Sequence, residues 1–307
     1  MLEPVAIDGK KILITGPTGQ VAEPVIAAWA QRCDLTALAR FSNPDDRARI
    51  EALGATCVAA DLAQPGSLAA LPDDFDYVLN FAVVKSGDFD YDLAANAEGL
   101  GRLMLHCRGV KAFLHLSSTA VYEHCGHEPR TEDAPLGDNH RVMFPTYSIS
   151  KIAAETVCRF TARQFYIPTT IARLSVPYGD NGGWPYFHLL MMEQGIPIEI
   201  HPERPNYYNL LHADDYLEKL PRLLAAASED VTTVNFGGSQ QTSIEEWCAY
   251  LSELTGFEPI FRDNPKAFGS LCIDTERMHS LIGPTQVDWR DGIMRQVQAL
   301  APQWLKA

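Results

Sequence analysis

Two residues with complementary chemistry stand four positions apart, Tyr147 and Lys151 in the stretch Tyr147-Ser-Ile-Ser-Lys151. In a helix, side chains at this spacing lie on one face, so the phenol and the ammonium would be neighbours. A free tyrosine has a pKa of about 10, too high for a base in neutral water, and a nearby cation lowers that pKa by favouring the phenolate. The spacing therefore predicts a pair that takes or returns the proton accompanying hydride transfer.

Three hydroxyl side chains stand 28 to 30 residues before Tyr147. Ser117, Ser118 and Thr119 follow the run Ala112-Phe-Leu-His-Leu116, which predicts a buried strand. A hydroxyl at the end of that strand can hydrogen-bond a substrate oxygen held beside the tyrosine.

A glycine-rich turn follows a buried strand predicted at 11–15 and precedes a helical pattern. Glycine at 16 permits a tight turn, and glycine at 19 lets the backbone approach a diphosphate. The helix start adds free N–H groups and the positive end of the helix dipole. Because the required strand and helix flank the turn, we predict a dinucleotide site here. Its residues are Gly16, Thr18, Gly19, Gln20 and Val21.

The end of the second predicted strand, 34–39, discriminates between the two dinucleotides. An NAD site usually places an acid there, roughly 20 residues after the glycines, to hold the ribose hydroxyls. This strand instead ends Leu38-Ala39-Arg40. The planar guanidinium of Arg40 suits a 2′-phosphate, so NADP is favoured over NAD, with a solvated surface arginine as the alternative.

The next two predicted strands also end in candidates for the cofactor site. Asp61 and Leu62 follow the third strand and are expected near the adenine. Phe81 and Ala82 end the fourth, at the carboxyl edge where open α/β sheets bind ligands.

The elements that must position these residues alternate along the chain. Apolar and β-branched runs predict strands, and helical periodicity lies between them around 46–53, 90–108 and 147–165. Such alternation indicates βαβ units and a parallel sheet with helices on both faces. The predicted fold is α/β, a doubly wound parallel-sheet Rossmann domain with a smaller C-terminal substrate lobe. The strands are predicted at 11–15, 34–39, 55–60, 77–82, 112–117, 169–173 and 232–236.

The composition changes after Pro177, where glycine, proline and aromatic residues become frequent. Such a region more often covers a ligand than links domains. We predict that residues 1–176 and about 209–239 form the NAD(P)-binding domain, and that 177–208 and 240–307 form the substrate lobe. Aromatic side chains suit an apolar or ring-bearing substrate or a sugar face, although some would simply pack the lobe. The candidates are Trp184 and Tyr208, with Tyr186, Phe187 and Tyr207 beside them.

The composition limits the classes of molecule that the protein is expected to bind. A formal net charge of −14 argues against binding nucleic acid or an anionic membrane. The absence of a signal-like segment and of a long apolar run predicts a soluble, cytoplasmic protein whose partner is a small-molecule substrate. Seven scattered cysteines favour reduced thiols. His124 and His127 fall short of a tetrahedral ligand set, so no metal site is predicted.

Taken in order along the chain, these motifs resemble those of the extended short-chain dehydrogenases/reductases of the NAD-dependent epimerase/dehydratase family. The resemblance covers nearly the whole chain. The matching segments are Thr-Gly-x-x-Gly, Asp61-Leu62, Asn80-Phe-Ala82, Asn96 in Ala-Asn-Ala-Glu-Gly99, Ser-Ser-x-x-Val-Tyr, Tyr-x-x-x-Lys, Arg173-Leu-Ser-Val-Pro-Tyr-Gly179 and Leu211-His-Ala-Asp-Asp215.

The resemblance implies a role for several residues. Tyr147 would be the acid/base, and Lys151 would activate it and bind the nicotinamide ribose. Ser118 matches the catalytic hydroxyl residue, with Thr119 as its nearest rival. Further matches are Asn96 as a substrate-side candidate and Pro177 near the nicotinamide. Family members often pair two helices into a homodimer, which here would be those near 90–108 and 147–165.

Two departures from the family pattern narrow the reaction. Thr119-Ala120 replaces the Asp-Glu of sugar-nucleotide dehydratases, which disfavours dehydration. Tyr208 replaces an arginine that commonly holds the diphosphate of a sugar nucleotide, with Arg204 as a substitute. We therefore expect an NAD(P)-dependent oxidoreductase acting on a secondary alcohol or carbonyl. The alternatives are a sugar-nucleotide epimerase that uses bound NAD transiently, and a non-catalytic nucleotide sensor.

Overall fold

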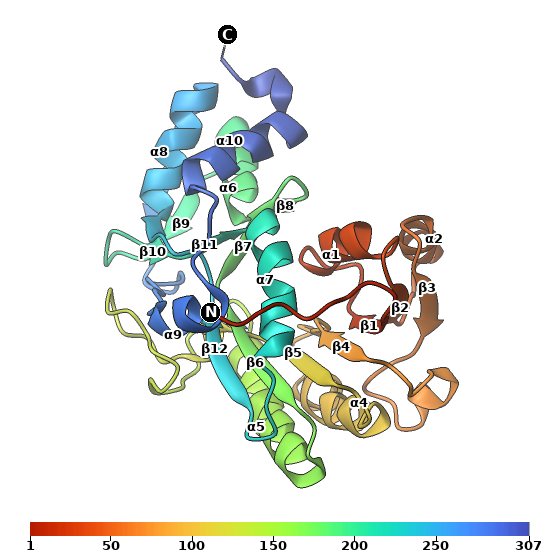
Figure 1. The fold of residues 1–307 in the computed structure, drawn as a ribbon. Helices are drawn as coiled ribbons and strands as arrows, with labels where there is room; N and C mark the ends of the chain where they lie inside the picture. The colour runs from red at the N-terminus through yellow and green to blue at the C-terminus, as the bar shows by residue number, and fades with distance from the viewer. Residues whose placement is uncertain (307) are drawn as a thin grey trace.

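A seven-stranded parallel sheet forms the centre of the computed structural model, which describes residues 1–306 (Figure 1). The strand order is β12-β6-β5-β4-β1-β2-β3. This arrangement confirms the predicted Rossmann fold class. The strands are β1 (Lys11–Thr15), β2 (Asp34–Ala39), β3 (Thr56–Ala59), β4 (Tyr77–Asn80), β5 (Ala112–Ser118), β6 (Thr169–Leu174) and β12 (Thr232–Phe236).

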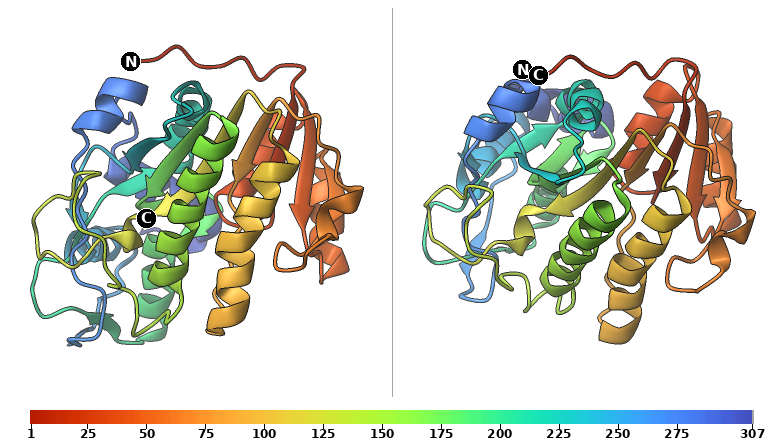
Figure 2. Two further views of the ribbon diagram at one scale, coloured as in Figure 1. Left: turned by 90° about the horizontal axis from the view of Figure 1, so that it is seen from below. Right: turned by 60° about the horizontal axis from the view of Figure 1, so that its bottom comes forward.

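Helices cover both faces of the sheet because successive strand residues point to opposite sides. In β1, Ile12 and Ile14 pack in one apolar cluster and Leu13 packs in another. Figure 2 shows α4 and α5 beside each other on the Leu13 face. On that face lie α4 (Gly99–His106) and α5 (Tyr147–Phe165), and on the other lie α1 (Ala22–Trp29), α2 (Pro44–Ala52), α7 (Ala213–Ala225) and α9 (Glu276–Ile282).

The helical stretch predicted near 90–108 is divided into three parts. It runs through α3 (Phe89–Leu93), a π-helical segment at Ala94–Glu98 and then α4. The π segment carries Asn96, and such segments often occur at functional sites.

A smaller lobe surrounds a third apolar cluster that includes the buried Trp247. Its short sheets have the orders β11-β7-β8, β10-β13 and β14-β9. Within the range predicted for this lobe, α9 packs instead against the central sheet. The lobe strands are β7 (Val176–Gly179), β8 (Gly182–Gly183), β9 (Ile198–Ile200), β10 (Tyr207–Tyr208), β11 (Leu210–His212), β13 (Thr242–Ser243) and β14 (Phe261–Asp263), and its helices are α6 (Trp184–Gln194), α8 (Ile244–Thr255) and α10 (Trp289–Leu300).

No helix within residues 1–306 combines the length and the apolar composition needed to cross a membrane.

Candidate active site

The glycine turn is pressed against the end of β4. Gly16 has a φ of +66°, and a Cβ at this position would lie 2.8 Å from the Cα of Ala82. Only glycine meets both conditions without strain. No side chain caps α1 at Val21, which leaves the start of the helix open to a ligand, although the Glu23 N–H donates to the Gly19 carbonyl at 3.1 Å and Pro24 has no N–H. The turn therefore fits the diphosphate of a dinucleotide.

A cavity of about 140 Å³ opens at this edge of the sheet. We call it the cofactor cavity. Of the predicted cofactor residues, six do not line it, and three of these are buried (Val21, Phe81 and Lys151); the other three are Gly19, Gln20 and Pro177. The residues that line it are Gly16, Thr18, Leu38, Ala39, Arg40, Ala60, Asp61, Leu62, Ala82, Val83, Val84, Ala95 and Asn96.

Arg40 and Asp61 are joined in this cavity by Tyr91, which sequence reasoning missed. The Tyr91 hydroxyl accepts a hydrogen bond from Arg40 Nη1 at 2.8 Å and donates one to Asp61 Oδ2 at 3.2 Å. Arg40 has no carboxylate partner among the described residues, and its side chain is exposed. Its guanidinium thus keeps donors for an anion. Tyr91 gave no signal in the sequence, because a tyrosine in a polar helical stretch is unremarkable by itself.

Tyr147, Lys151 and Ser118 meet where β5 ends and α5 begins. Tyr147 is the first residue of α5, Lys151 follows one turn later, and Ser118 is the last residue of β5. The Lys151 ammonium donates to the Leu116 carbonyl at 2.8 Å, which holds it against the sheet. The predicted catalytic residues therefore lie together.

The electrostatics at Tyr147 differ from the expectation that a cation lowers its pKa. Burial raises the pKa of Tyr147, and a hydrogen bond with Ser118 acts in the opposite direction. Lys151 is itself buried, and this burial lowers its pKa to about 8, with Glu155 opposing the shift and Lys85 adding to it. The reason is desolvation, which disfavours the charged form of both groups.

A second cavity, of about 410 Å³, lies in front of Tyr147, and we call it the substrate cavity. Residues predicted for catalysis and for substrate binding line it, and so do Gln20 and Pro177, which were predicted for the cofactor site. A hydrogen bond of 3.2 Å runs from Gln20 Nε2 to the Pro177 carbonyl. The lining consists of Gln20, Lys85, Ser118, Thr119, His140, Met143, Phe144, Tyr147, Ser175, Val176, Pro177, Trp184, Phe187, Tyr208, Phe268 and Leu271.

Asn96 lies outside the substrate cavity. Its side chain donates to the Val84 carbonyl at 2.8 Å and accepts from the Val84 N–H at 2.7 Å. A third hydrogen bond, to Ser150 Oγ at 3.2 Å, ties it to α5. The asparagine thus fixes the backbone beside the cofactor cavity.

Lys85 and His140 are functional candidates that sequence reasoning missed. The Lys85 ammonium lies 4.7 Å from the centre of the Phe144 ring and 5.4 Å from that of Tyr147. His140 stacks on Phe268 with ring centres 4.2 Å apart, and burial together with Lys85 lowers its pKa to about 4. His140 is therefore neutral at physiological pH. A lysine soon after the fourth strand was the only sequence signal for Lys85.

Aromatic side chains form the far wall of the substrate cavity. The rings of Trp184 and Tyr208 are 4.9 Å apart, and the Tyr208 hydroxyl donates to the Gly269 carbonyl at 2.6 Å. Burial raises the pKa of Tyr208, so it stays uncharged. Tyr186 and Tyr207 do not line the cavity. Arg204, the expected substitute for the missing arginine, is ion-paired with Asp263 and does not line it either.

Residues 12–237 match the model of the NAD dependent epimerase/dehydratase family. The chain belongs to this family. Family membership and the shared fold indicate an NAD-dependent enzyme. No functionally curated protein matches the sequence.

Solved structures of the family share the fold at low sequence identity. UDP-glucuronic acid 4-epimerase from Bacillus cereus, in complex with UDP-glucuronic acid and NAD, is 20% identical with a TM-score of 0.80, covering 96% of this chain and 100% of that one. An epimerase from Methanothermobacter thermautotrophicus is 19% identical with a TM-score of 0.81, covering 97% and 94%. UDP-glucose 4-epimerase from Thermotoga maritima, with UDP-glucose, is 18% identical with a TM-score of 0.79, covering 95% and 99%.

Proposed function

We propose that the protein is an NADP-dependent oxidoreductase that interconverts a secondary alcohol and a carbonyl on a small, ring-bearing molecule. The observation that carries this proposal is the substrate cavity in front of Tyr147. Six of the residues that line it are Phe, Tyr or Trp, and Lys85 is the one lysine or arginine that lines it within residues 1–306. Such a lining favours an apolar ring over a nucleoside diphosphate, because a single cation offers few charge-assisted contacts to two phosphate groups.

Each catalytic side chain has a task in this reaction. When bound, the nicotinamide ring supplies or accepts the hydride. Tyr147 Oη gives a proton to the carbonyl oxygen during reduction and takes it back during oxidation. The Ser118 hydroxyl orients that oxygen by a hydrogen bond. We assign to Lys151, which donates to the Leu116 carbonyl, the task of favouring the phenolate form of Tyr147 against the burial that raises the pKa of this phenol.

Arg40 supports the preference for NADP. It extends from the end of β2 into the cofactor cavity, at the position where NAD sites usually carry an acid. Its guanidinium is bound by a neutral hydroxyl and by no carboxylate of the described chain, so a 2′-phosphate would find an unneutralised cation there.

The second candidate is a sugar-nucleotide epimerase, because the solved structures named above include UDP-sugar 4-epimerases with NAD. That reaction needs a grip on the substrate diphosphate. Tyr208 stands in place of one arginine, and Arg204 is engaged by Asp263. These two contacts favour the oxidoreductase.

The outer faces of α4 and α5 support a proposal that the protein forms a homodimer through these helices. Leu105 and Phe160 are exposed apolar residues there, with 42% and 66% of their surface accessible. Pairing with a second copy would bury them.

A cytoplasmic location is likewise a proposal, supported by seven cysteines that are all unpaired.

A direct assay separates the two candidate reactions. Purified protein is given NADPH with a panel of cyclic ketones and aryl aldehydes, and separately UDP-glucose or UDP-glucuronic acid. We expect loss of the reduced-nicotinamide absorbance with a ring-bearing carbonyl and no change in the sugar nucleotides. Protein that retains NAD through purification and epimerises a UDP-sugar, seen by NMR, would overturn the oxidoreductase.

A further inference from the structure

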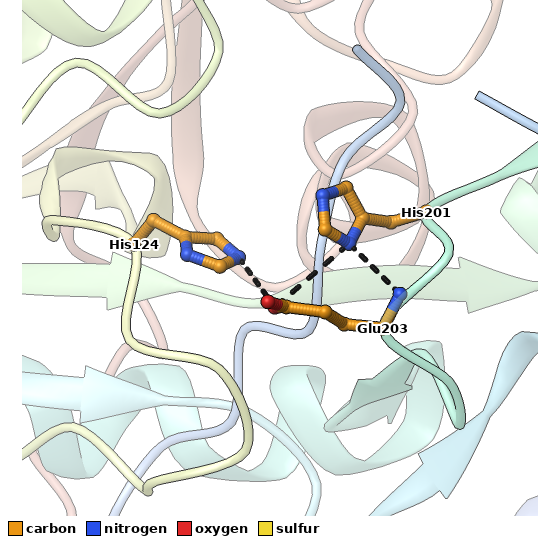
Figure 3. A group of neighbouring side chains, drawn as sticks. All are labelled: His124, His201 and Glu203. Atoms are coloured by element: carbon orange, nitrogen blue, oxygen red, sulfur yellow. Dashed lines mark hydrogen bonds and ion pairs between the residues drawn. The ribbon is translucent and has the colours of Figure 1, made fainter. Parts of the chain in front are cut away.

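Two histidines and a glutamate from distant parts of the chain meet on the surface of the smaller lobe (Figure 3). His124 follows the turn after β5, whereas His201 and Glu203 follow β9. The Glu203 carboxylate lies 3.9 Å from His124 Nε2 and 3.9 Å from His201 Nδ1. One nitrogen of each histidine and one carboxylate oxygen all lie within 4.8 Å of one another.

The two histidines are the only ion-pair partners of the Glu203 carboxylate in the described chain. The neighbouring Arg204 is engaged by Asp263 instead. His201 Nδ1 accepts the Glu203 backbone N–H at 3.2 Å, a contact that a metal ion at this nitrogen would replace. Figure 3 shows that Nδ1 also faces the carboxylate. A carboxylate oxygen between two imidazole rings is a donor set for a cation.

We propose that His124, His201 and Glu203 bind a zinc ion, with solvent as the fourth ligand. Two imidazole nitrogens and one carboxylate oxygen are a usual zinc set, and bond lengths of about 2.0–2.1 Å in a tetrahedron place ligand atoms about 3.3 Å apart. The observed 3.9 Å pairs therefore need to close by only a small amount. The side chains of His124 and Glu203 are 45% and 62% exposed, which leaves them free to make that movement.

Gly269 leaves the space that the His124 ring occupies. A Cβ at position 269 would lie 2.4 Å from His124 Nε2, the atom that would bind zinc. The Gly269 carbonyl also accepts a hydrogen bond from the Tyr208 hydroxyl, and the neighbouring Phe268 lines the substrate cavity. A zinc ion here would thus join the loop after β5 to the loop after β9, next to a wall of that cavity.

The experiment is a zinc titration of the full-length, chelator-treated protein by calorimetry. The triple variant His124→Ala/His201→Ala/Glu203→Gln gives the background from thiols and other histidines. We expect each single variant to weaken zinc binding about a hundredfold, because two ligands hold the ion far less tightly than three. His106→Ala is the control: this histidine lies at the end of α4, outside the ligand group, and its removal should leave affinity within about threefold.

Two further measurements make the result specific. Gly269→Ala should displace the exposed His124 ring and weaken zinc binding without lowering the thermal unfolding temperature of the zinc-free protein. Cobalt added in place of zinc should give the intense visible absorption of a four-coordinate ion, and the triple variant should lose it. Wild-type affinity no higher than that of the triple variant, or an equal loss in His106→Ala, would overturn the proposal.

Discussion

The cofactor cavity and the substrate cavity are assembled in different ways. The first collects residues at the ends of β1, β2, β3 and β4, together with the π-helical segment at Ala94–Glu98. The second draws its lining from eight separate stretches between Gln20 and Leu271. Strand ends of a parallel sheet meet at one edge by construction, whereas the loops of the lobe meet only through packing.

The two cavities also differ in the charge that they offer. The cofactor cavity contains an exposed guanidinium, an aspartate and the glycine turn that leads to the uncapped start of α1, and the guanidinium and the helix start suit an anionic ligand. The substrate cavity contains one lysine, a neutral histidine and aromatic rings. The comparison indicates that charged groups recognise the cofactor in this chain, whereas the shape of an aromatic wall recognises the substrate.

Replacing Tyr147 with phenylalanine should separate the two cavities most clearly. We expect kcat to fall by about 100- to 10,000-fold, since the general acid/base is lost. NADP affinity should remain within about threefold, because Tyr147 does not line the cofactor cavity. Steady-state kinetics and a nucleotide-binding titration measure both. Full activity in this variant would mean that another group acts as the acid/base.

Gly16→Ala should weaken binding of the cofactor. The new Cβ meets the Ala82 backbone at 2.8 Å, in a conformation with φ of +66°. We expect NADP affinity to fall by about 30- to 100-fold, equivalent to roughly 2–3 kcal/mol of strain and displacement. Gly9→Ala is the control, because Gly9 has a φ of +67° and no atom within 4 Å of the added Cβ. Equal losses in both variants would show that backbone strain alone, and not the close approach, controls binding.

Arg40→Ala tests whether the protein prefers NADP over NAD. Loss of a charge-assisted contact to the 2′-phosphate should weaken NADP binding by about 10- to 100-fold and leave NAD binding unchanged. Tyr91→Phe removes the hydrogen-bond partner of Arg40 without removing its charge, and should change NADP affinity much less. Titrations with both nucleotides provide the readout. Parallel effects on NAD and NADP would remove the assignment of NADP.

The pH dependence of kcat/KM tests whether the reaction requires the positive charge of Lys151. Burial, and to a lesser extent Lys85, lowers the pKa of Lys151 to about 8, so its cation is present below that pH and lost above it. Activity should therefore fall by about tenfold per pH unit above 8 if the cation is required. Lys85→Met removes a like charge and should move this fall to higher pH. A profile that stays level from pH 7 to 10 would contradict a role for the Lys151 charge.

Much of the site could be predicted because its residues follow regular elements. Tyr147 and Lys151 share a helix face, and Gly16, Arg40 and Asp61 each follow a strand, so periodicity together with the family resemblance located them. Tyr91, Lys85 and His140 could not be found this way. Their roles depend on contacts with Arg40, Tyr147 and Phe268 that no local pattern encodes.

By itself, the sequence determined the family, the Rossmann sheet and the pair at Tyr147 and Lys151, since local spacing and hydrophobic alternation control each of them. Tertiary structure decided what surrounds that pair. It buried Tyr147 and Lys151 so that desolvation governs their pKa values, engaged Arg204 with Asp263, and brought His124 to His201. These outcomes depend on how distant loops pack, and packing is a property of the folded chain as a whole.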